Sequence, residues 1–132
     1  RALKLWFHLR LDGVEVIRAR LRRDLDNARW LAEQVSSTPG WRVLAPVNLQ
    51  TVVLRHEPAG LVSGTGAVLD AGALNAHTLS WVDQVNTSGS ALVTPSLLDG
   101  TWSVRVSIGA EATERQDVEE LWGLLKQAAG GD

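Results

Sequence analysis

Three histidines are the side chains of this sequence best suited to bind a metal or move a proton. His8, His56 and His77 fall in three different expected elements, and none belongs to an H-x-x-x-H pair. Zinc sites in proteins take three or four ligands, commonly at short, recognisable spacings. We therefore expect isolated surface or capping histidines and no metal site.

Motifs that activate a nucleophile or cradle a phosphate are also missing. The chain has no cysteine, and its serines form no G-x-S-x-G elbow. Residues 64–66 read G-T-G without the G-K-[ST] of a phosphate-binding loop, which predicts a flexible loop. The arginine-rich segment Arg18–Arg23 could contact phosphate, but Glu15, Asp24 and Asp26 lie in or beside it, which indicates a solvated helix face of mixed charge.

Lysine is the remaining residue that could form a covalent bond with a carbonyl cofactor. Only Lys4 and Lys126 are present, and neither follows a histidine in a loop at the end of a strand. From the residues alone we expect no catalytic residue and no cofactor-binding residue in this chain.

Composition limits the classes of protein that remain. The 132 residues are 45% hydrophobic and 21% charged, which is typical of one globular domain. A net charge of −2 argues against nucleic acid or anionic lipid as a partner. No apolar run approaches the length of a membrane-spanning helix. We expect a soluble, cytoplasmic domain, and the abrupt start without methionine suggests a piece of a longer protein.

Hydrophobic spacing predicts four helices. Residues 2–11 are apolar on every side, which is typical of a helix that is buried or docks on another body. Three amphipathic helices should follow, the last one capped by Thr113 and Gln116. The expected buried stripes are Val14, Ile17, Leu21, Leu25, Ala28, Ala32 and Val35; Leu74, Thr78, Trp81, Val82 and Val85; and Val118, Leu121, Trp122 and Leu125.

Four strands are expected in two pairs. The first pair is 41–45 with 49–56, and the second is 91–98 with 102–109 around the turn Asp99-Gly100. In the last strand Trp102, Val104, Val106 and Ile108 alternate with polar residues, which indicates one buried face. The fold class is α+β, a two-layer sandwich in the order α-α-β-β-α-β-β-α, with helices on one face of an antiparallel sheet.

Six tryptophans raise the question of a stacking site for bases or sugars. Five of them lie at or beside the apolar stripes and are expected in the core, whereas Trp41 at the start of a strand stands apart. The five are Trp6, Trp30, Trp81, Trp102 and Trp122.

Two segments resemble the group II pyridoxal-phosphate-dependent amino acid decarboxylases. Residues 1–14, R-A-L-K-L-W-F-H-L-R-L-D-G-V, are similar to the family's R-[AS]-L-K-x-W-x-x-x-R-x-x-G-V. Residues 104–109, followed by Thr113 and the helix with Trp122, are similar to its V-L-R-x-x-I ending, although Ser103 stands where that pattern has its first valine. The loop at 57–73 is richer in glycine and alanine than the family's.

The resemblance implies a place in a type I pyridoxal-phosphate enzyme. Residues 1–132 would be the small C-terminal domain, with 1–12 as a docking helix and 13–132 as the sandwich. The large domain, with the Schiff-base lysine of an S-x-H-K motif and the pyridoxal phosphate, would precede Arg1. The whole enzyme would be a homodimeric carbon–carbon lyase that releases CO2 from an L-amino acid. An aromatic substrate is favoured, with glutamate, aspartate or diaminobutyrate left open.

Two arginines match positions of the family's motifs. Arg1 corresponds to the last arginine of R-R-F-R, and Arg105 corresponds to the strand arginine of V-L-R. We expect both at the seam with the large domain as structural ion pairs, and a role in the active site is the alternative. A free-standing ligand-binding or regulatory α+β module is the alternative for the whole chain. The apolar helix expected at 2–11 argues against such a module, because a self-contained domain rarely exposes a large apolar surface.

Overall fold

The structure is a computed structural model, which describes residues 2–130. Its elements follow the expected order α-α-β-β-α-β-β-α. They are α1 (Ala2–Leu11), α2 (Val14–Ser37), β1 (Trp41–Val43), β2 (Thr51–His56), α3 (Ala71–Thr87), β3 (Thr94–Leu98), β4 (Thr101–Ser107) and α4 (Arg115–Ala128). Arg1 lies outside the described residues.

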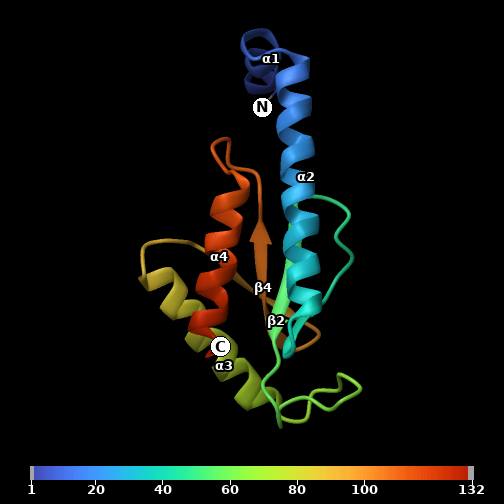
Figure 1. Cartoon of the computed structure of the whole chain (residues 1–132), viewed down its shortest axis with the longest axis vertical. Helices are drawn as coiled ribbons and strands as arrows, with labels where there is room; N and C mark the ends of the chain where they lie inside the picture. The colour runs from blue at the N-terminus through green and yellow to red at the C-terminus, as the bar shows by residue number, and fades with distance from the viewer. Residues whose placement is uncertain (1, 131–132) are drawn as a thin grey trace.

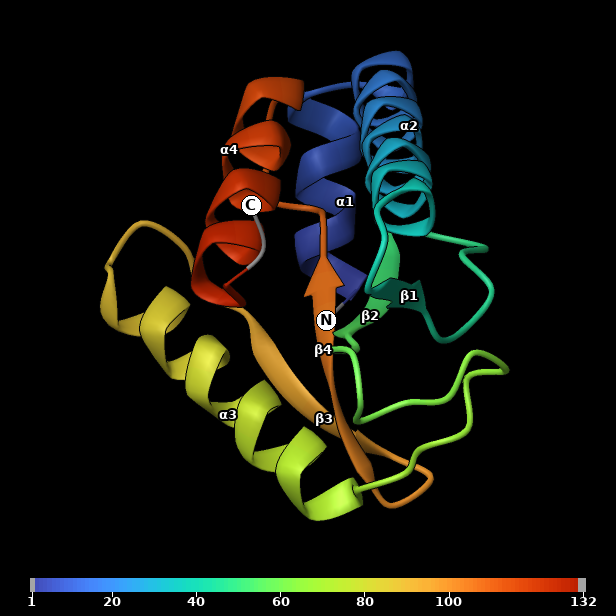
Figure 2. The same cartoon turned by 60° about the horizontal axis from the view of Figure 1, so that its bottom comes forward.

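The four strands form one antiparallel sheet in the order β1-β2-β4-β3. In register, Leu54 of β2 lies opposite Val104 of β4, and Val52 lies opposite Val106. All four side chains are buried in the same core as the helix residues. The helices therefore cover one face of the sheet, with α2 alongside α4 and α3 at an angle to them (Figures 1 and 2). The expected two-layer α+β fold is confirmed.

A tight turn joins β3 to β4. Asp99 and Gly100 both have positive φ angles, 48° and 78°, which match the two central residues of a type I′ turn. Asp-Gly tolerates this conformation well, and its twist suits an antiparallel pair. The hairpin predicted around these two residues is confirmed.

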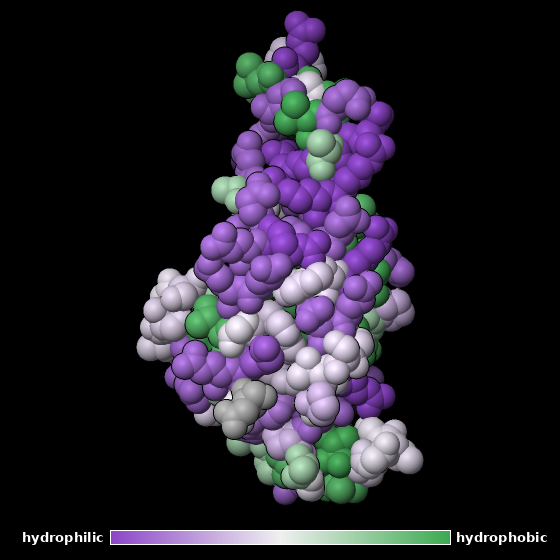
Figure 3. All heavy atoms as spheres, viewed as in Figure 1, coloured by the Kyte–Doolittle hydropathy of each residue, from purple (hydrophilic) through white to green (hydrophobic). Residues whose placement is uncertain are grey.

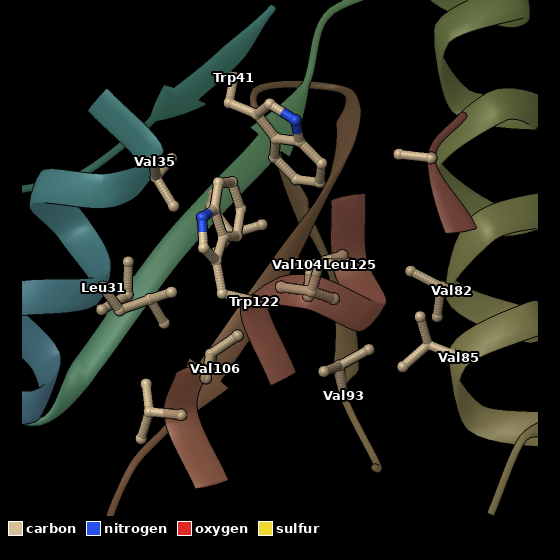
Figure 4. Close-up of a cluster of buried hydrophobic side chains, with 14 of the residues drawn as sticks. Leu31, Val35, Trp41, Val82, Val85, Val93, Val104, Val106, Trp122 and Leu125 are labelled. Carbon is tan, nitrogen blue, oxygen red and sulfur yellow. The ribbon is translucent and has the colours of Figure 1, made fainter. Parts of the chain in front are cut away.

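The core is centred on three tryptophans. The ring of Trp41 on β1 meets the ring of Trp122 on α4 at 4.9 Å and that of Trp81 on α3 at 5.8 Å between centroids, both edge-on. Figure 4 shows Trp41 and Trp122 side by side between the sheet and the helices. The expectation that Trp41 stands apart from the core is wrong, because β1 lies beside β2 and its first side chain points towards the helices.

The buried stripe of α3 is the predicted one, and that of α2 is not. Val14 and Leu21 are exposed, while Asp24, Asn27, Ala28, Leu31 and Val35 are the buried residues of α2. The first turns of α2 extend past the end of the sheet, where they meet only α1 and the segment around Glu111 instead of the core (Figure 1). The helical period was correct, but periodicity cannot show where along a helix its partner surface ends.

Helix α1 has no buried residue. Its large apolar side chains are 40% to 80% exposed, and they lie at the end of the molecule remote from the core (Figure 3). Trp6, expected in the core, is 52% exposed. The apolar helix predicted at 2–11 is therefore present without a partner in this part of the chain.

The predicted cap of α4 is displaced by one residue. Glu114, not Thr113, is the N-cap residue, and its backbone N–H donates to Asp117 at 2.7 Å. Both pairs have the spacing of a capping box, so the sequence pattern alone could not choose between them.

No helix between residues 2 and 130 has the length and apolar character needed to cross a membrane.

The tryptophan core leads to a stability prediction. We expect Trp122→Ala to lower the free energy of unfolding by about 3–5 kcal/mol, because the large ring is 4% exposed and leaves a cavity. The matched control is Trp6→Ala on α1, expected within about 0.5 kcal/mol of wild type. Urea denaturation of both variants measures the difference, and similar losses for the two would contradict this account of the core.

Candidate functional site

The polar side of the sheet, opposite the helices, carries the candidate residue Arg105. In register on β4, Arg105 lies between Val53 of β2 and Thr94 of β3. Arg105 and Ser107 are exposed, as expected from strict alternation along the strand. The guanidinium is thus free to meet a group on another body.

An ion pair organises the neighbouring part of this face. Arg55 donates from Nε to Glu57 Oε1 at 3.1 Å, and its Nη2 contacts the same oxygen. Its Nη1 donates to the hydroxyl of Thr101 at 2.8 Å. The side chains of Arg55 and Glu57 are only 6% and 12% exposed. Removing one partner of such a pair leaves a buried charge unpaired, which is costly.

The buried state of Ser103 corrects one expectation. The alternation expected along this strand, with one buried face, places Ser103 on the other face together with Arg105, yet Ser103 is fully buried. Its hydroxyl donates to the backbone oxygen of Ser96 at 2.8 Å. Ser103 is small, and the side chain of Arg55 on the adjacent strand reaches along the same face to Thr101, so its neighbours cover it.

The loop between β2 and α3 closes one edge of this face. Arg42 of β1 donates to the backbone oxygen of Gly66 at 3.1 Å and thereby ties the loop to the sheet. A pocket of about 590 Å³ lies there, with Arg42, Arg55 and Thr101 among its lining residues. The charged and polar side chains of the lining are two arginines, Asp99 and the hydroxyl of Thr101, a set that suits ion pairing with a docked group.

The two lysines, at which no covalent chemistry is expected, both lie on helices, away from the polar face of the sheet. Arg1 lies outside the described residues. Lys4 is exposed on α1, and Lys126 lies on α4 with its ammonium over the ring of Trp122. Within residues 2–130 no group of three or more His, Cys, Asp or Glu side chains is placed to hold a metal ion.

Two histidines expected to be isolated are in contact. His56 Nδ1 at the end of β2 lies 2.8 Å from His77 Nε2 of α3. Burial lowers the pKa of His56 to about 4, helped by repulsion from His77 and opposed by Glu57. Burial also lowers the pKa of His77. The expectation of isolated histidines is wrong for this pair, and no local pattern could reveal a contact across 21 residues.

Comparison with known proteins gives relatives over nearly the whole chain. No family model matches. A tryptophan decarboxylase of Camptotheca acuminata is 32% identical over 129 residues, 98% of this chain and 24% of that protein. A phenylacetaldehyde synthase of a Rosa hybrid cultivar is 30% identical over 98% of this chain and 25% of its own length. The chain thus spans about a quarter of the length of these relatives.

The comparison with solved structures also finds decarboxylases. Tryptophan decarboxylase of Catharanthus roseus in complex with L-tryptophan is 26% identical, with a TM-score of 0.80 over 98% of this chain and 25% of that one. This chain is a homologue of the small C-terminal domain of pyridoxal-phosphate-dependent decarboxylases. The Oryza sativa enzyme with pyridoxal phosphate and tryptamine, 24% identical, shares the fold with a TM-score of 0.83 over 97% of this chain and 26% of its own. The resemblance inferred from the two motifs is confirmed.

The pair His56 and His77 predicts a dependence of the stability of this domain on pH. Between pH 4 and 6.5 the unfolded chain binds a proton at His56 that the folded chain does not, so the free energy of unfolding should rise with pH across that window. His56→Gln should remove part of this rise, whereas His8→Gln, which changes an exposed histidine of α1, should preserve it. Urea denaturation at several pH values provides the test, and identical slopes in wild type and His56→Gln would refute it.

Proposed function

We propose that this chain is the C-terminal domain of an enzyme that releases CO2 from an L-amino acid with the help of pyridoxal phosphate. The observation that carries the proposal is the alignment of 98% of the chain with tryptophan and tyrosine decarboxylases at 32% and 30% identity. The arrangement of helices and strands supports it, because the same fold occurs in the solved decarboxylases.

The residues of this chain do not fit a cofactor site of their own. Lys4 is exposed on a helix without a buried residue, and Lys126 lies over Trp122, so neither is held in a polar cradle for a phosphate. Pyridoxal phosphate acts as an electron sink in its enzymes and needs groups that hold its ring and phosphate. In our proposal a large domain supplies those groups, and this chain contributes scaffold and contacts.

Two surfaces of the chain support contacts with that large domain. The apolar helix α1 is exposed along its length, which disfavours a self-contained module and suits residues 1–12 as a docking helix beside the sandwich of 13–132. The exposed guanidinium of Arg105 suits an ion pair with a carboxylate across the domain seam. Arg1 is proposed for the same seam on the family's motif alone.

The substrate we propose is an aromatic L-amino acid. Tryptophan and tyrosine decarboxylases are among the relatives at 30% identity or more. A glutamate decarboxylase domain of Vibrio parahaemolyticus, 19% identical, shares the fold only, so acidic amino acids and diaminobutyrate are secondary candidates. The proposal also places the enzyme in the cytoplasm as a homodimer, as the resemblance implies.

The proposed division of labour between domains can be tested directly. Residues 1–132 mixed with pyridoxal phosphate should yield no stoichiometric borohydride-trapped adduct on Lys4 or Lys126 and should release no CO2. The polypeptide that carries this chain together with its large domain should release labelled CO2 from L-tryptophan or L-tyrosine. An adduct with activity in residues 1–132 alone, or no CO2 from any amino acid in the longer polypeptide, would refute the proposal.

The seam role of Arg105 leads to a second prediction. Arg105→Ala should change the free energy of unfolding of residues 1–132 by no more than about 0.5 kcal/mol, because the side chain is exposed. The same change in the longer enzyme should impair cofactor retention or activity. Arg55→Ala is the contrasting variant, expected to destabilise residues 1–132 because the half-buried Glu57 keeps only the more distant Arg42, at 3.9 Å, as a partner. Strong destabilisation of residues 1–132 by Arg105→Ala would place that arginine in the domain's own network instead.

A further inference from the structure

The contact between His56 and His77 joins two elements that the chain separates widely. His56 is the last residue of β2, and His77 lies in the second turn of α3. Their ring centroids are 5.0 Å apart and the ring planes are inclined by 46°. Only one proton fits between the two facing nitrogens, so one ring donates and the other accepts.

The ring of His56 is held on its other sides by fixed groups. It packs on Trp41, with the ring centroids 4.9 Å apart. Gly40, whose φ of 78° suits glycine, brings its backbone against the same ring, and a Cβ there would lie 3.4 Å from His56 Nε2. These contacts decide which edge of the imidazole faces α3, and that edge carries Nδ1.

The separation of the two nitrogens equals the spacing required by a square-planar metal ion. At metal–nitrogen distances of about 2.0 Å, two nitrogens at adjacent corners of such an ion lie about 2.8 Å apart. The observed distance between His56 Nδ1 and His77 Nε2 is 2.8 Å. A small rotation of both rings would turn the two lone pairs towards one point beside the present hydrogen bond.

The electrostatic surroundings favour neutral imidazole, which is the form that binds metals. Burial lowers the pKa of both histidines, so protons compete weakly for the nitrogens at neutral pH. The charged groups beside His56 are Glu57, its partner Arg55, and Arg42 at 3.9 Å from Glu57, so together they carry one net positive charge.

We propose that His56 and His77 form a two-histidine binding site for a divalent transition metal ion, with Cu²⁺ as the preferred ion. Imidazole nitrogen suits Cu²⁺, which favours square-planar geometry and binds most tightly in the divalent series. Binding displaces the hydrogen shared by the two rings, which moves through water to the outer nitrogen of the donor ring, so both imidazoles stay neutral. Water fills the remaining positions on the metal, since residues 2–130 offer no third side-chain ligand there. The bound ion would clamp α3 to the sheet.

The test uses CuCl2 and the purified chain at neutral pH. One equivalent of Cu²⁺ should raise the Tm, and frozen-solution electron paramagnetic resonance should show coupling to two imidazole nitrogens. His77→Gln and His56→Gln each retain a side chain able to hydrogen-bond to the remaining histidine but remove one metal ligand. In both variants we expect the rise in Tm and the second nitrogen coupling to be lost.

His8→Gln is the matched control. His8 also has a potential partner ligand, since its Nδ1 lies 3.0 Å from Asp12, but that pair is exposed on α1. This variant should retain the full copper response. The proposal is overturned if wild type shows no stoichiometric response to Cu²⁺, if His56→Gln and His77→Gln both keep it, or if His8→Gln abolishes it.

Discussion

The edge-on contact of Trp41 with Trp81 and Trp122 is the interaction on which the rest of this domain depends. β1 has only three residues and could not hold an edge position by its backbone hydrogen bonds alone. Its tryptophan reaches across to α3 and α4 and buries a large ring between them. The short strand, the two helices and the end of β2 thus share one centre, and α2 adds Leu31 and Val35 to it.

Because the core lies on one face of the sheet, it determines which kinds of side chain the opposite face carries. Side chains that alternate away from the tryptophans find no helix to pack on, and most of them are polar or charged, with Val53 and Leu98 as the apolar exceptions. Near the β3–β4 turn this face is satisfied internally, because Arg55 has both Glu57 and Thr101 as partners. Further along β4, Arg105 has no such partner among residues 2–130 and is exposed. One half of this face therefore has its polar side chains paired within the domain. The other half exposes Arg105, and it is the part suited to contact with another domain.

The sequence predicted what depends on neighbours close along the chain. The stripe of α3, from Leu74 to Val85, and the Asp99-Gly100 turn are local patterns, and the structure has them as predicted. The family motifs likewise located Arg105 on a strand. The burial of Trp41, the exposure of Trp6 and the contact of His56 with His77 depend on which elements meet in space. Periodicity within one element contains no information on that, so these three expectations were wrong.

Helix α1 exposes apolar side chains to solvent although the core of the domain is fully formed. The sandwich closes around its tryptophans without any contribution from α1, whose residues 2–11 are all exposed. An apolar helix in water gains nothing from its leucines and aromatic rings, and its position is set here only by Gly13 and the start of α2. Folding of the domain leaves those side chains exposed, so their burial can still contribute free energy when a partner docks. The position and orientation of α1 are therefore what a partner can determine.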